Sequence, residues 1–503
     1  MNAPLRRVGV VVIVLFALLF INLNWVQAYK ADAYRTNEHN ARVQLSAYQR
    51  QRGSIVLSDG QTIVAQSVAT TDTLKYLRKY PLGAPFAQVV GYQSVNGGST
   101  GIERVENDFL SGNASSLFTN RIKDIFTGNK TSGGNIMLTL SKAAQEKAYD
   151  DLVNNQVGAK HAAAVAIDPG TGAILAMAST PSYDPNPIVS HDTEAAQSAY
   201  DALDKNADEP LLNRAVQTAY PPGSTMKVVV SAAALSTGQY NPQSVLQATN
   251  SYTPIAGGGF SIHNAGPGTC PQANITLIDA LTVSCNTAFA RLGVSLGADK
   301  VKSMAQAFGF EDTGLTVASE GNASITVAAS HTGPMTGSSG QDDPNAVAQS
   351  SIGQLDVVET PLQDALVAAT VANGGVEMRP YLVEKQQAPD LTTTFAASPK
   401  TWHTPISSAA AGQLQQMMES VVQNGTGTAA QIDGYQVGGK TGTAQNGETA
   451  NTHGWFIGFA MKDGKPIVAV CVFLERAGNG GSHEAARIAG DIMKAVIAER
   501  GAK

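Results

Sequence analysis

A serine and a lysine are spaced for nucleophilic catalysis in the segment PPGSTMKVVVSAAAL, residues 221–235. The Pro-Pro-Gly run predicts a turn, and Ser224 then begins an apolar helix on which Lys227 lies one turn further along the same face. Apolar neighbours would desolvate the lysine, lower its pKa and let it accept the serine proton. The helix N-terminus would stabilise a developing oxyanion. Taken alone, the pattern also fits an N-cap serine beside a surface lysine.

The segment GGKTGTAQ, residues 438–445, carries a second lysine among hydroxyl side chains. Extended backbone would let Lys440, Thr441 and Thr443 line a cleft and hold an anion, whereas the alternative is a plain edge strand protected by its lysine. The residues from Gly434 to Thr441 also match the phosphate-loop pattern G-x-x-x-x-G-K-T. Because glycines and an asparagine soon follow the lysine, no helix can begin there, and we reject a nucleotide-binding loop.

A third candidate pair is Ser284 and Asn286, within the sequence Leu-Thr-Val-Ser-Cys-Asn at 281–286. A hydroxyl and an amide two residues apart could flank a site from a loop between helices. Serine and asparagine also cap helices in most proteins, so this pair is uninformative by itself. The three segments together, in this order along one region of the chain, are far more specific than any one of them.

The elements that must position these residues are predicted from periodicity and turns. Apolar runs on either side of Pro169-Gly-Thr-Gly predict a β-hairpin, and the segments GGKTGTAQ, GWFIGFAM and IVAVCVFLE, within 438–475, predict consecutive antiparallel strands. Residues 156–503 are therefore expected to form one α/β (α+β) domain with a five-stranded antiparallel sheet flanked by helices. The expected helices are 143–154, 224–237, 275–293, 297–308, 360–373, 405–423 and 484–499, and the longest expected loop is 317–350.

The N-terminus predicts a membrane anchor, because the residues from Val8 to Ala28 carry no charge. At a rise of 1.5 Å per residue, about 20 such residues cross the hydrocarbon core of a bilayer. Arg6 and Arg7 precede the span within a seven-residue tail, which predicts a cytoplasmic N-terminus and an extracytoplasmic remainder. The alternative is a signal peptide cleaved after Ala28 or near 31–33. Residues 30–155 are polar, lack strong helical periodicity before 143, and are expected to form a separate domain.

Composition excludes several function classes. Among 503 residues, 43% are apolar and 15% charged, which excludes wholesale disorder. The formal charge of −6, without a long basic run, argues against nucleic-acid binding. No C-x-x-C or H-x-x-x-H pattern occurs, and we expect neither a metal nor a cofactor. Export permits a disulfide between Cys270 and Cys285, which the sequence leaves open, and Cys471 lies in an apolar run that predicts a buried strand.

The three segments match, in order, the motifs of β-lactamases and penicillin-binding proteins: Ser-x-x-Lys at 224–227, Ser-x-Asn at 284–286 and Lys-Thr-Gly at 440–442. The chain thus resembles the penicillin-recognising serine transpeptidases over nearly its whole length. Upstream, Arg52-Gly-Ser-Ile and Gly101-Ile-Glu resemble the non-catalytic pedestal of the class B members, and no segment resembles a glycosyltransferase domain. The likeness is greatest to short class B proteins of actinobacteria that are linked to cell division.

This resemblance implies a D,D-transpeptidase that cross-links peptidoglycan stem peptides and is acylated by β-lactams. Ser224 would attack the D-Ala-D-Ala carbonyl, Lys227 would take the serine proton, and Ser284 would relay a proton to the leaving amine. Asn286 would orient Lys227 and the substrate amide. Backbone N–H groups of Ser224 and Thr443 would form the oxyanion hole. The residues expected to hold the terminal carboxylate of the substrate are Lys440, Thr441, Gly442 and Thr443.

The resemblance also implies a membrane glycosyltransferase and division proteins as partners. Three alternatives stay open: a D,D-carboxypeptidase that uses water as the acceptor, a β-lactamase, and a non-enzymatic β-lactam sensor or division scaffold. A β-lactamase would need a base for deacylation that the sequence does not reveal. Cys285, in the middle of the second motif, departs from many relatives but leaves the roles of its serine and asparagine intact.

Overall fold

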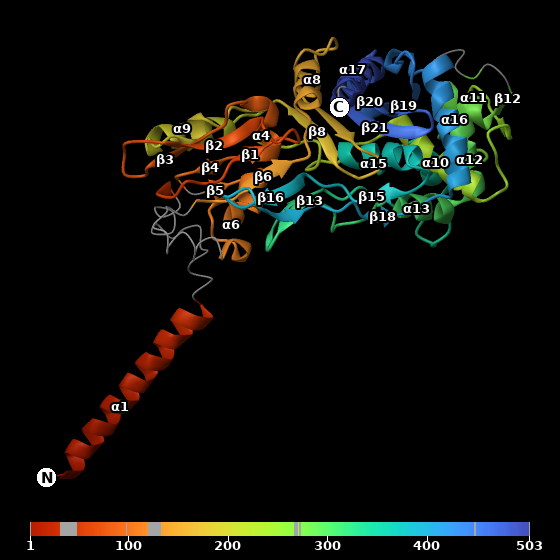
Figure 1. The fold of residues 1–503 in the computed structure, drawn as a ribbon. Helices are drawn as coiled ribbons and strands as arrows, with labels where there is room; N and C mark the ends of the chain where they lie inside the picture. Colours follow the sequence, from red (N-terminus) through yellow and green to blue (C-terminus); the bar gives the residue numbers. More distant parts are fainter. Residues whose placement is uncertain are drawn as a thin grey trace.

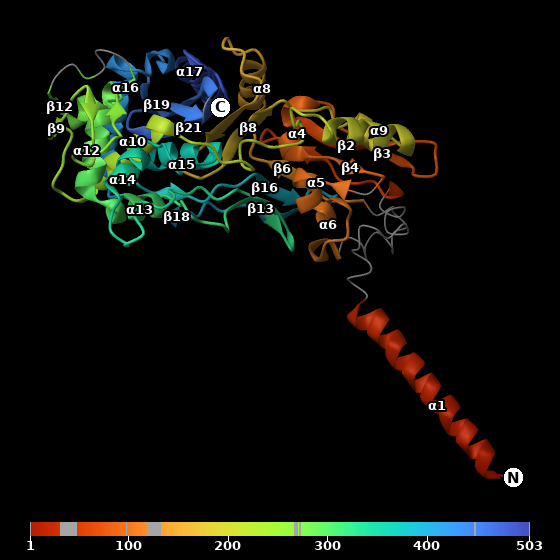
Figure 2. The same cartoon turned by 180° about the vertical axis from the view of Figure 1, so that it is seen from behind.

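A computed structural model describes residues 2–30, 48–96, 98–118, 132–265, 270, 273–446 and 449–501. An N-terminal helix is followed by an elongated body, in which the N-terminal strands gather at one end and the C-terminal strands at the other (Figures 1 and 2). The alternative cleavage site at 31–33 lies outside the described residues.

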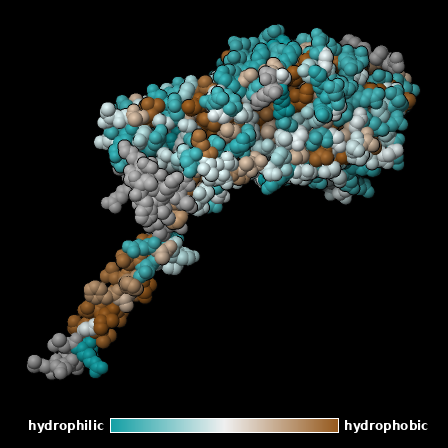
Figure 3. Space-filling model, in the orientation of Figure 1, coloured by the Kyte–Doolittle hydropathy of each residue, from teal (hydrophilic) through white to brown (hydrophobic). Residues whose placement is uncertain are grey.

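The N-terminal helix α1 (Asn2–Asn24) continues into the π-helical turn η1 (Trp25–Tyr29). The stretch Arg6–Tyr29 has a mean hydropathy of 2.5, and none of it is buried against the rest of the chain. Its apolar surface stands out in Figure 3 against the mostly polar body. A helix of this length and composition suits a single-pass membrane anchor.

The catalytic end is built on a five-stranded antiparallel sheet, which confirms the predicted architecture. Alternate residues of its strands belong to two separate hydrophobic cores, because successive side chains point to opposite faces. Helices α8 (Lys142–Val153) and α17 (Gly481–Gly501) cover one face, and the wholly buried α15 (Pro361–Ala372) packs on the other. In spatial order the strands are β19 (Gln436–Asn446), β20 (Thr449–Lys462), β21 (Lys465–Leu474), β7 (Ala162–Ile167) and β8 (Ile174–Thr180).

The pedestal contains a six-stranded sheet that joins distant parts of the chain. Its strands, in spatial order, are β17 (Thr393–Ala396), β16 (Val383–Gln387), β6 (Asn135–Leu138), β1 (Ile55–Val56), β2 (Ile63–Ala69) and β3 (Tyr76–Lys79). Two of these strands come from the expected catalytic domain, while α8, from the expected pedestal, packs on the catalytic sheet. Each end of the body therefore contains elements from both sides of residue 155 in the sequence.

Most of the expected helices form, with two differences. The expected helix 275–293 is broken into α11 (Leu277–Thr282) and α12 (Asn286–Leu296), with Ser284 between them at a φ of 60°. The expected loop 317–350 is wrong in part, since it contains a hairpin of β13 (Thr316–Glu320) and β14 (Ala323–Thr326), and helix α14 (Pro344–Ser350). The side chain of Asp343 caps α14 by accepting hydrogen bonds from two backbone N–H groups.

The remaining helices are short or surround the catalytic sheet. At the end of the body that contains the six-stranded sheet they are α4 (Ala84–Val90), α5 (Gly101–Val105), α6 (Asn107–Leu110) and α9 (Thr193–Asp204). Elsewhere they are the 3₁₀ turn η4 (Gly223–Thr225), α10 (Met226–Ser236), α13 (Ala298–Ala307) and α16 (Ser408–Asn424). Short two-stranded sheets pair β9 (Val245–Gln247) with β12 (Asn274–Thr276), β10 (Ser251–Tyr252) with β11 (Ile262–His263), β15 (Glu377–Met378) with β18 (Thr401–His403), and β4 (Gln93–Ser94) with β5 (Gly98–Ser99).

Candidate active site

The turn that carries Ser224 packs directly against strand β19. Ser224 lies in η4, and Lys227 follows in the first turn of α10. A Cβ atom on Gly223, which has a φ of 61°, would lie 2.5 Å from Thr443 O. A Cβ atom on Gly442 would likewise lie 2.5 Å from Pro222 O. Glycine at both positions thus lets the serine turn and the Lys-Thr-Gly-Thr strand touch.

Lys227 is fully buried beneath this turn and is held by the second motif. Its Nζ atom donates to Asn286 Oδ1 at 2.7 Å, to Ser284 O at 2.9 Å and to Ser284 Oγ at 3.3 Å. Burial, with a smaller contribution from the charge of Lys440, lowers the pKa of Lys227 well below its usual value. Among the hydrogen bonds of the described residues, none joins Lys227 to Ser224, and the two lie three residues apart, in η4 and in the first turn of α10.

The side chain of Lys440, on strand β19, also reaches Ser284. Its Nζ atom donates to Ser284 Oγ and to Thr441 O, each at 2.9 Å. Burial lowers the pKa of Lys440 to about 7. Ser284 Oγ therefore lies between two buried amines, within 3.3 Å of one and 2.9 Å of the other. A hydroxyl in this place can accept a proton from one side and donate one to the other.

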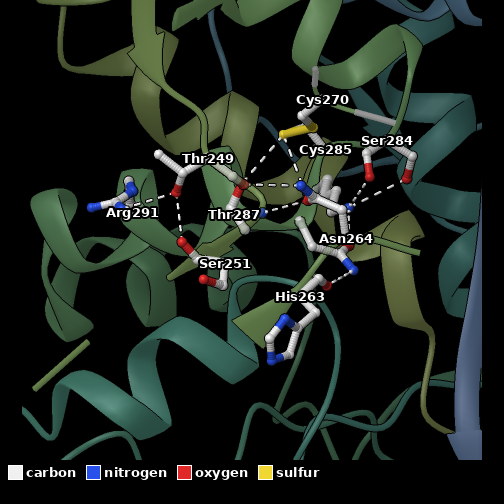
Figure 4. The surroundings of a disulfide bond; sticks show 11 residues. Thr249, Ser251, His263, Asn264, Cys270, Ser284, Cys285, Thr287 and Arg291 are labelled. Atoms are coloured by element: carbon white, nitrogen blue, oxygen red, sulfur yellow. Dashed lines mark hydrogen bonds between the residues drawn. A yellow bond between two sulfur atoms is a disulfide. The ribbon is translucent and has the colours of Figure 1, made fainter. Parts of the chain in front are cut away.

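The second motif is held by the cleft wall between β10 and α12. Asn286 Nδ2 donates to His263 O at 3.0 Å, while its Oδ1 accepts from Lys227. Asn264 Oδ1 accepts from the backbone N–H at 287 at 3.1 Å. Cys285 is bonded to Cys270, so the disulfide left open by the sequence forms beside the motif (Figure 4). Cys471 is buried in β21, as predicted.

These groups surround a cleft of about 730 Å³. The predicted residues that line it are Ser224, Ser284, Asn286, Thr441 and Thr443. Thr443 is exposed, whereas the side chain of Lys440 is fully buried beneath the cleft floor. The three sequence motifs thus meet at one place, although they come from a helix, an interhelical turn and a strand.

Sequence reasoning missed several contributors to this site. Thr426 Oγ1 lies 2.5 Å from Thr441 Oγ1, and His263 holds Asn286 through its backbone carbonyl. Neither contact leaves a local pattern in the sequence. Any residue at 263 could supply the backbone carbonyl, and Thr426 lies outside the Lys-Thr-Gly segment that contains Thr441. Within the described parts of the chain, no group of three or more His, Cys, Asp or Glu residues could hold a metal ion.

The arrangement can perform acyl transfer on a substrate that ends in a carboxylate. A hydroxyl nucleophile and a bridging hydroxyl line one cleft, and two desolvated amines are buried against the bridging hydroxyl. The charged form of Lys440 and the hydroxyls of Thr441 and Thr443 are suited to an anion.

Comparisons with known proteins agree with this chemistry. The family model described as penicillin binding protein transpeptidase domain matches residues 162–494, and that of the penicillin binding protein A dimerisation domain matches residues 52–136. The peptidoglycan D,D-transpeptidase PbpA of Mycolicibacterium smegmatis is 41% identical over 502 residues, which cover 99% of each chain. The protein of the same name from Mycobacterium tuberculosis is 38% identical over 504 residues, which cover 99% of this chain and 98% of that protein.

Solved structures show the same likeness. Penicillin-binding protein A of M. tuberculosis, as a ceftriaxone acyl-enzyme, superimposes with a TM-score of 0.83 at 37% sequence identity. Its penicillin G acyl-enzyme gives a TM-score of 0.80 at the same identity. Both comparisons cover 90% of this chain and 100% of the other.

Proposed function

This chain belongs to the class B penicillin-binding protein transpeptidases, and from that premise we propose that it is a serine-type peptidoglycan D,D-transpeptidase with Ser224 as its nucleophile. The observation that carries this proposal is the meeting of three motifs at Ser284, whose hydroxyl is hydrogen-bonded to both Lys227 and Lys440. Peptidoglycan stem peptides ending in D-Ala-D-Ala are the substrates, and β-lactams are covalent inhibitors.

Acylation begins when Ser224 Oγ attacks the carbonyl carbon of the penultimate D-Ala. Lys227 accepts the serine proton, since its lowered pKa favours the neutral amine. Cleavage of the C–N bond releases the terminal D-Ala, whose amine takes a proton through Ser284. An amine of a neighbouring stem peptide then attacks the acyl-enzyme and forms the cross-link, and Ser224 regains its proton.

Lys440, with Thr441 and Thr443, holds the terminal carboxylate of the donor. The pKa of Lys440 is about 7 without ligand, so an arriving carboxylate favours the charged amine and strengthens the contact. Because Gly442 has no side chain, strand β19 can approach Pro222 closely, and this brings the carboxylate-binding residues beside the nucleophile.

The oxyanion hole is assigned to the backbone N–H groups of Ser224 and Thr443. Its support is the contact between the two backbones, which only a glycine at 223 permits. Asn286, fixed on both sides by Lys227 and His263, orients the base and the substrate amide. Loss of one oxyanion-hole donor would cost about 3–4 kcal/mol of transition-state stabilisation.

The anchor helix α1 places the enzyme at a membrane. Arg6 and Arg7 support a cytoplasmic N-terminus, with the catalytic domain on the extracytoplasmic side. We assign residues 30–155 to the pedestal and 156–503 to catalysis, joined through the shared six-stranded sheet. A membrane glycosyltransferase and division proteins are the partners that this setting suggests, and wall synthesis at division is the process.

Intact-mass spectrometry of the full-length protein in detergent, after incubation with penicillin G, tests the proposal beside Ser224→Ala. We expect one covalent adduct on the wild type and none on the variant, which should remain folded because a helix-end serine contributes only about 1 kcal/mol. Hydrolysed penicillin without an adduct would indicate a β-lactamase, and neither product would indicate a scaffold. Exchange of the terminal D-Ala of a peptide for a D-amino acid, rather than its hydrolysis, would separate transpeptidase from carboxypeptidase.

A further inference from the structure

Two acidic side chains, Glu359 and Asp364, are buried together behind the nucleophile turn. Each is 1% exposed. Asp364 lies in the first turn of α15, and Glu359 immediately precedes the Thr360 cap of that helix. Figures 1 and 2 place α15 against β21 and close to α10. Neither carboxyl group lines the catalytic cleft or takes part in the chemistry described above.

No cation of the described residues compensates this pair. The influences on the two carboxyl groups are burial, their mutual interaction and hydrogen bonding to Thr225. Cys471, which faces them from β21, has its own pKa raised by burial and by both carboxylate charges. On β15, packed against α15, Glu377 is paired instead with His403 at 3.1 Å. Two ionised carboxylates are therefore very unfavourable here, and a proton must be held between them.

Two carboxyl oxygen atoms of this buried pair lack a hydrogen-bond donor. Glu359 Oε2 and Asp364 Oδ2 are buried and have no hydrogen-bond partner by geometry. The two carboxyl groups nevertheless lie within hydrogen-bonding reach of each other. A shared proton gives this buried pair a donor, as it does between the two carboxyl groups of an aspartic protease.

The pair touches the serine turn through Thr225. The Thr225 hydroxyl is 3.3 Å from Pro222 O and 3.4 Å from Glu359 Oε1. A hydroxyl has one proton to donate, so it can donate to only one of these two oxygens. When the shared proton lies between the two carboxyl groups, Glu359 carries little charge and competes weakly for the Thr225 hydroxyl, which donates to Pro222 O. If both acids are ionised, Thr225 must turn its proton to Glu359.

The backbone adds a second connection between the pair and the nucleophile. Glu359 and Tyr220 exchange two backbone hydrogen bonds, each of 2.9 Å, four residues before Ser224. Any shift of Glu359 is thus transmitted to both ends of the Tyr220–Thr225 segment. Within this segment, Pro222 O also contacts Gly442 of the carboxylate-holding strand.

We propose that Glu359 and Asp364 hold one shared proton and act as positioning residues, keeping Thr225 hydrogen-bonded to Pro222 O at the turn that carries Ser224. Loss of the proton leaves two buried negative charges, withdraws the Thr225 hydroxyl from Pro222 and displaces the nucleophile. Burial raises the pKa of Asp364 to about 8 and that of Glu359 well above its usual value, so the proton is lost on the alkaline side. The inference rests on the proposed acylation of Ser224.

The test compares penicillin acylation rates of the full-length wild type, Glu359→Gln and Glu359→Ala from pH 6 to pH 10. The glutamine amide can donate to Asp364 as a protonated Glu359 does and leaves a neutral group beside Thr225, whereas alanine cannot donate. We expect alanine to lower the rate about tenfold to a hundredfold at neutral pH, and glutamine to restore most of it. Above pH 8 the wild-type rate should fall relative to that of Glu359→Gln, and the rate ratio cancels the titration of Lys227 and Lys440.

Glu377→Gln is the matched control, because it removes a buried carboxyl that contacts neither Thr225 nor the turn. Its rate ratio to the wild type should not change with pH. A ratio of wild type to Glu359→Gln that is constant across the range, with normal wild-type acylation, would overturn the positioning role alone. Absence of any wild-type adduct would overturn the proposed function and the inference with it.

Infrared spectroscopy keeps the test valid if the variants do not fold. The wild type should show the carbonyl stretch of a protonated buried carboxyl that disappears near pH 8 together with acylation, after the buried Glu106 and Glu377, whose pKa values are about 7, have ionised. A band whose loss is not accompanied by loss of acylation, or no such band at neutral pH, would overturn the proposal.

Discussion

The buried Glu103 cluster of the pedestal and the catalytic centre both contain several ionisable groups, but only the Glu103 cluster pairs charges of opposite sign. In the pedestal, Glu103 is fully buried between Arg52 and Arg78, whose Nε atoms lie 2.7 and 2.6 Å from its two oxygens. Burial alone would raise the pKa of Glu103, but the two guanidinium groups hold it below its usual value. At the catalytic centre, Lys227 and Lys440 have only neutral hydrogen-bond partners within the described part of the chain, and Ser284 is common to both.

This difference separates charges that hold the fold from charges that do chemistry. A compensated cluster is strongly fixed in one protonation state, and it links β3, α5 and the Arg52 segment. An uncompensated buried amine has a depressed pKa, and it can change protonation during a reaction. Behind the serine turn, Glu359 and Asp364 form the acidic counterpart of the two lysines. The nucleophile thus lies between a pair of basic side chains, Lys227 and Lys440, and a pair of acidic side chains, Glu359 and Asp364.

The largest expected effect is that of Lys227→Met, which removes the base but keeps the bulk of its side chain. Acylation by penicillin should fall about 10²–10⁴-fold. The free energy of unfolding should stay the same or rise, because a buried amine without a counter-charge is replaced by an apolar group. Stopped-flow acylation and urea unfolding measure the two quantities.

Lys147→Met is the control for this substitution, since Lys147 is 42% exposed and pairs with Asp151 at the surface. It should leave acylation unchanged. A Lys227→Met protein that loses stability in proportion to its activity would show that the lysine is structural, and the contrast with the pedestal would disappear.

Glu103→Ala tests the opposite half of the comparison. It leaves Arg52 and Arg78 buried without a counter-charge, and we expect a loss of about 3–5 kcal/mol in the free energy of unfolding. The acylation rate per folded molecule should not change, because the cluster lies outside the catalytic cleft. Urea unfolding and active-site titration with penicillin measure these effects.

The exposed pair Lys142–Glu146, on α8, provides the matched control for an ion pair. Glu146→Ala should change stability by about 0–1 kcal/mol. A similarly small effect of Glu103→Ala would mean that the buried cluster is not a structural element of the pedestal.

The catalytic sheet could be predicted from the sequence because four of its five strands contain apolar runs bounded by turns, and the fifth, β19, carries the Lys-Thr-Gly motif. The three motifs were equally visible, since Ser224 and Lys227 are close in sequence, as are Ser284 and Asn286. The break at Ser284 was not predictable in this way: neither glycine nor proline interrupts 281–286, and the positive φ of Ser284 is imposed by its tertiary contacts.

The parts that could not be predicted depend on long-range contacts. Strand β16 joins the pedestal sheet by pairing with β6, more than two hundred residues earlier, and no local pattern records that choice. The disulfide was permitted by export, but only the proximity of the two cysteines in space decides it. Glu359 precedes the cap of α15 and Asp364 lies in its first turn, and the contact of Glu359 with Thr225 is visible only in three dimensions.

Lys440→Ala is expected to have an intermediate effect. Acylation should fall about tenfold to a hundredfold, the loss of one charge-assisted contact to the substrate carboxylate. The wild-type advantage should shrink above pH 7, because the amine with a pKa of about 7 is then mostly neutral. Acylation rates of the two proteins from pH 6 to pH 9 measure both effects. Equal acylation rates in the wild type and Lys440→Ala would show that Lys440 does not bind the substrate carboxylate.

The smallest expected effect is a change of slope in the pH dependence of stability for the double variant Glu359→Gln/Asp364→Asn, which removes both acids that share the proton. The folded-state pKa of Asp364, about 8, exceeds its ordinary value of 3.8, so the folded state binds a proton that the unfolded state has released between these values. Its contribution to stability is complete below about pH 4 and is lost as the pH rises through 8. Between pH 5 and pH 7 the wild type should therefore lose about 1.4 kcal/mol per pH unit through this one proton, and the double variant should not. Urea unfolding at these pH values measures the slopes, and Asp299→Asn, at an exposed acid in the first turn of α13, provides the control. Parallel slopes for the wild type and the double variant would show that both acids are ionised in the folded protein, and that the charges behind the nucleophile are compensated like those of the Glu103 cluster.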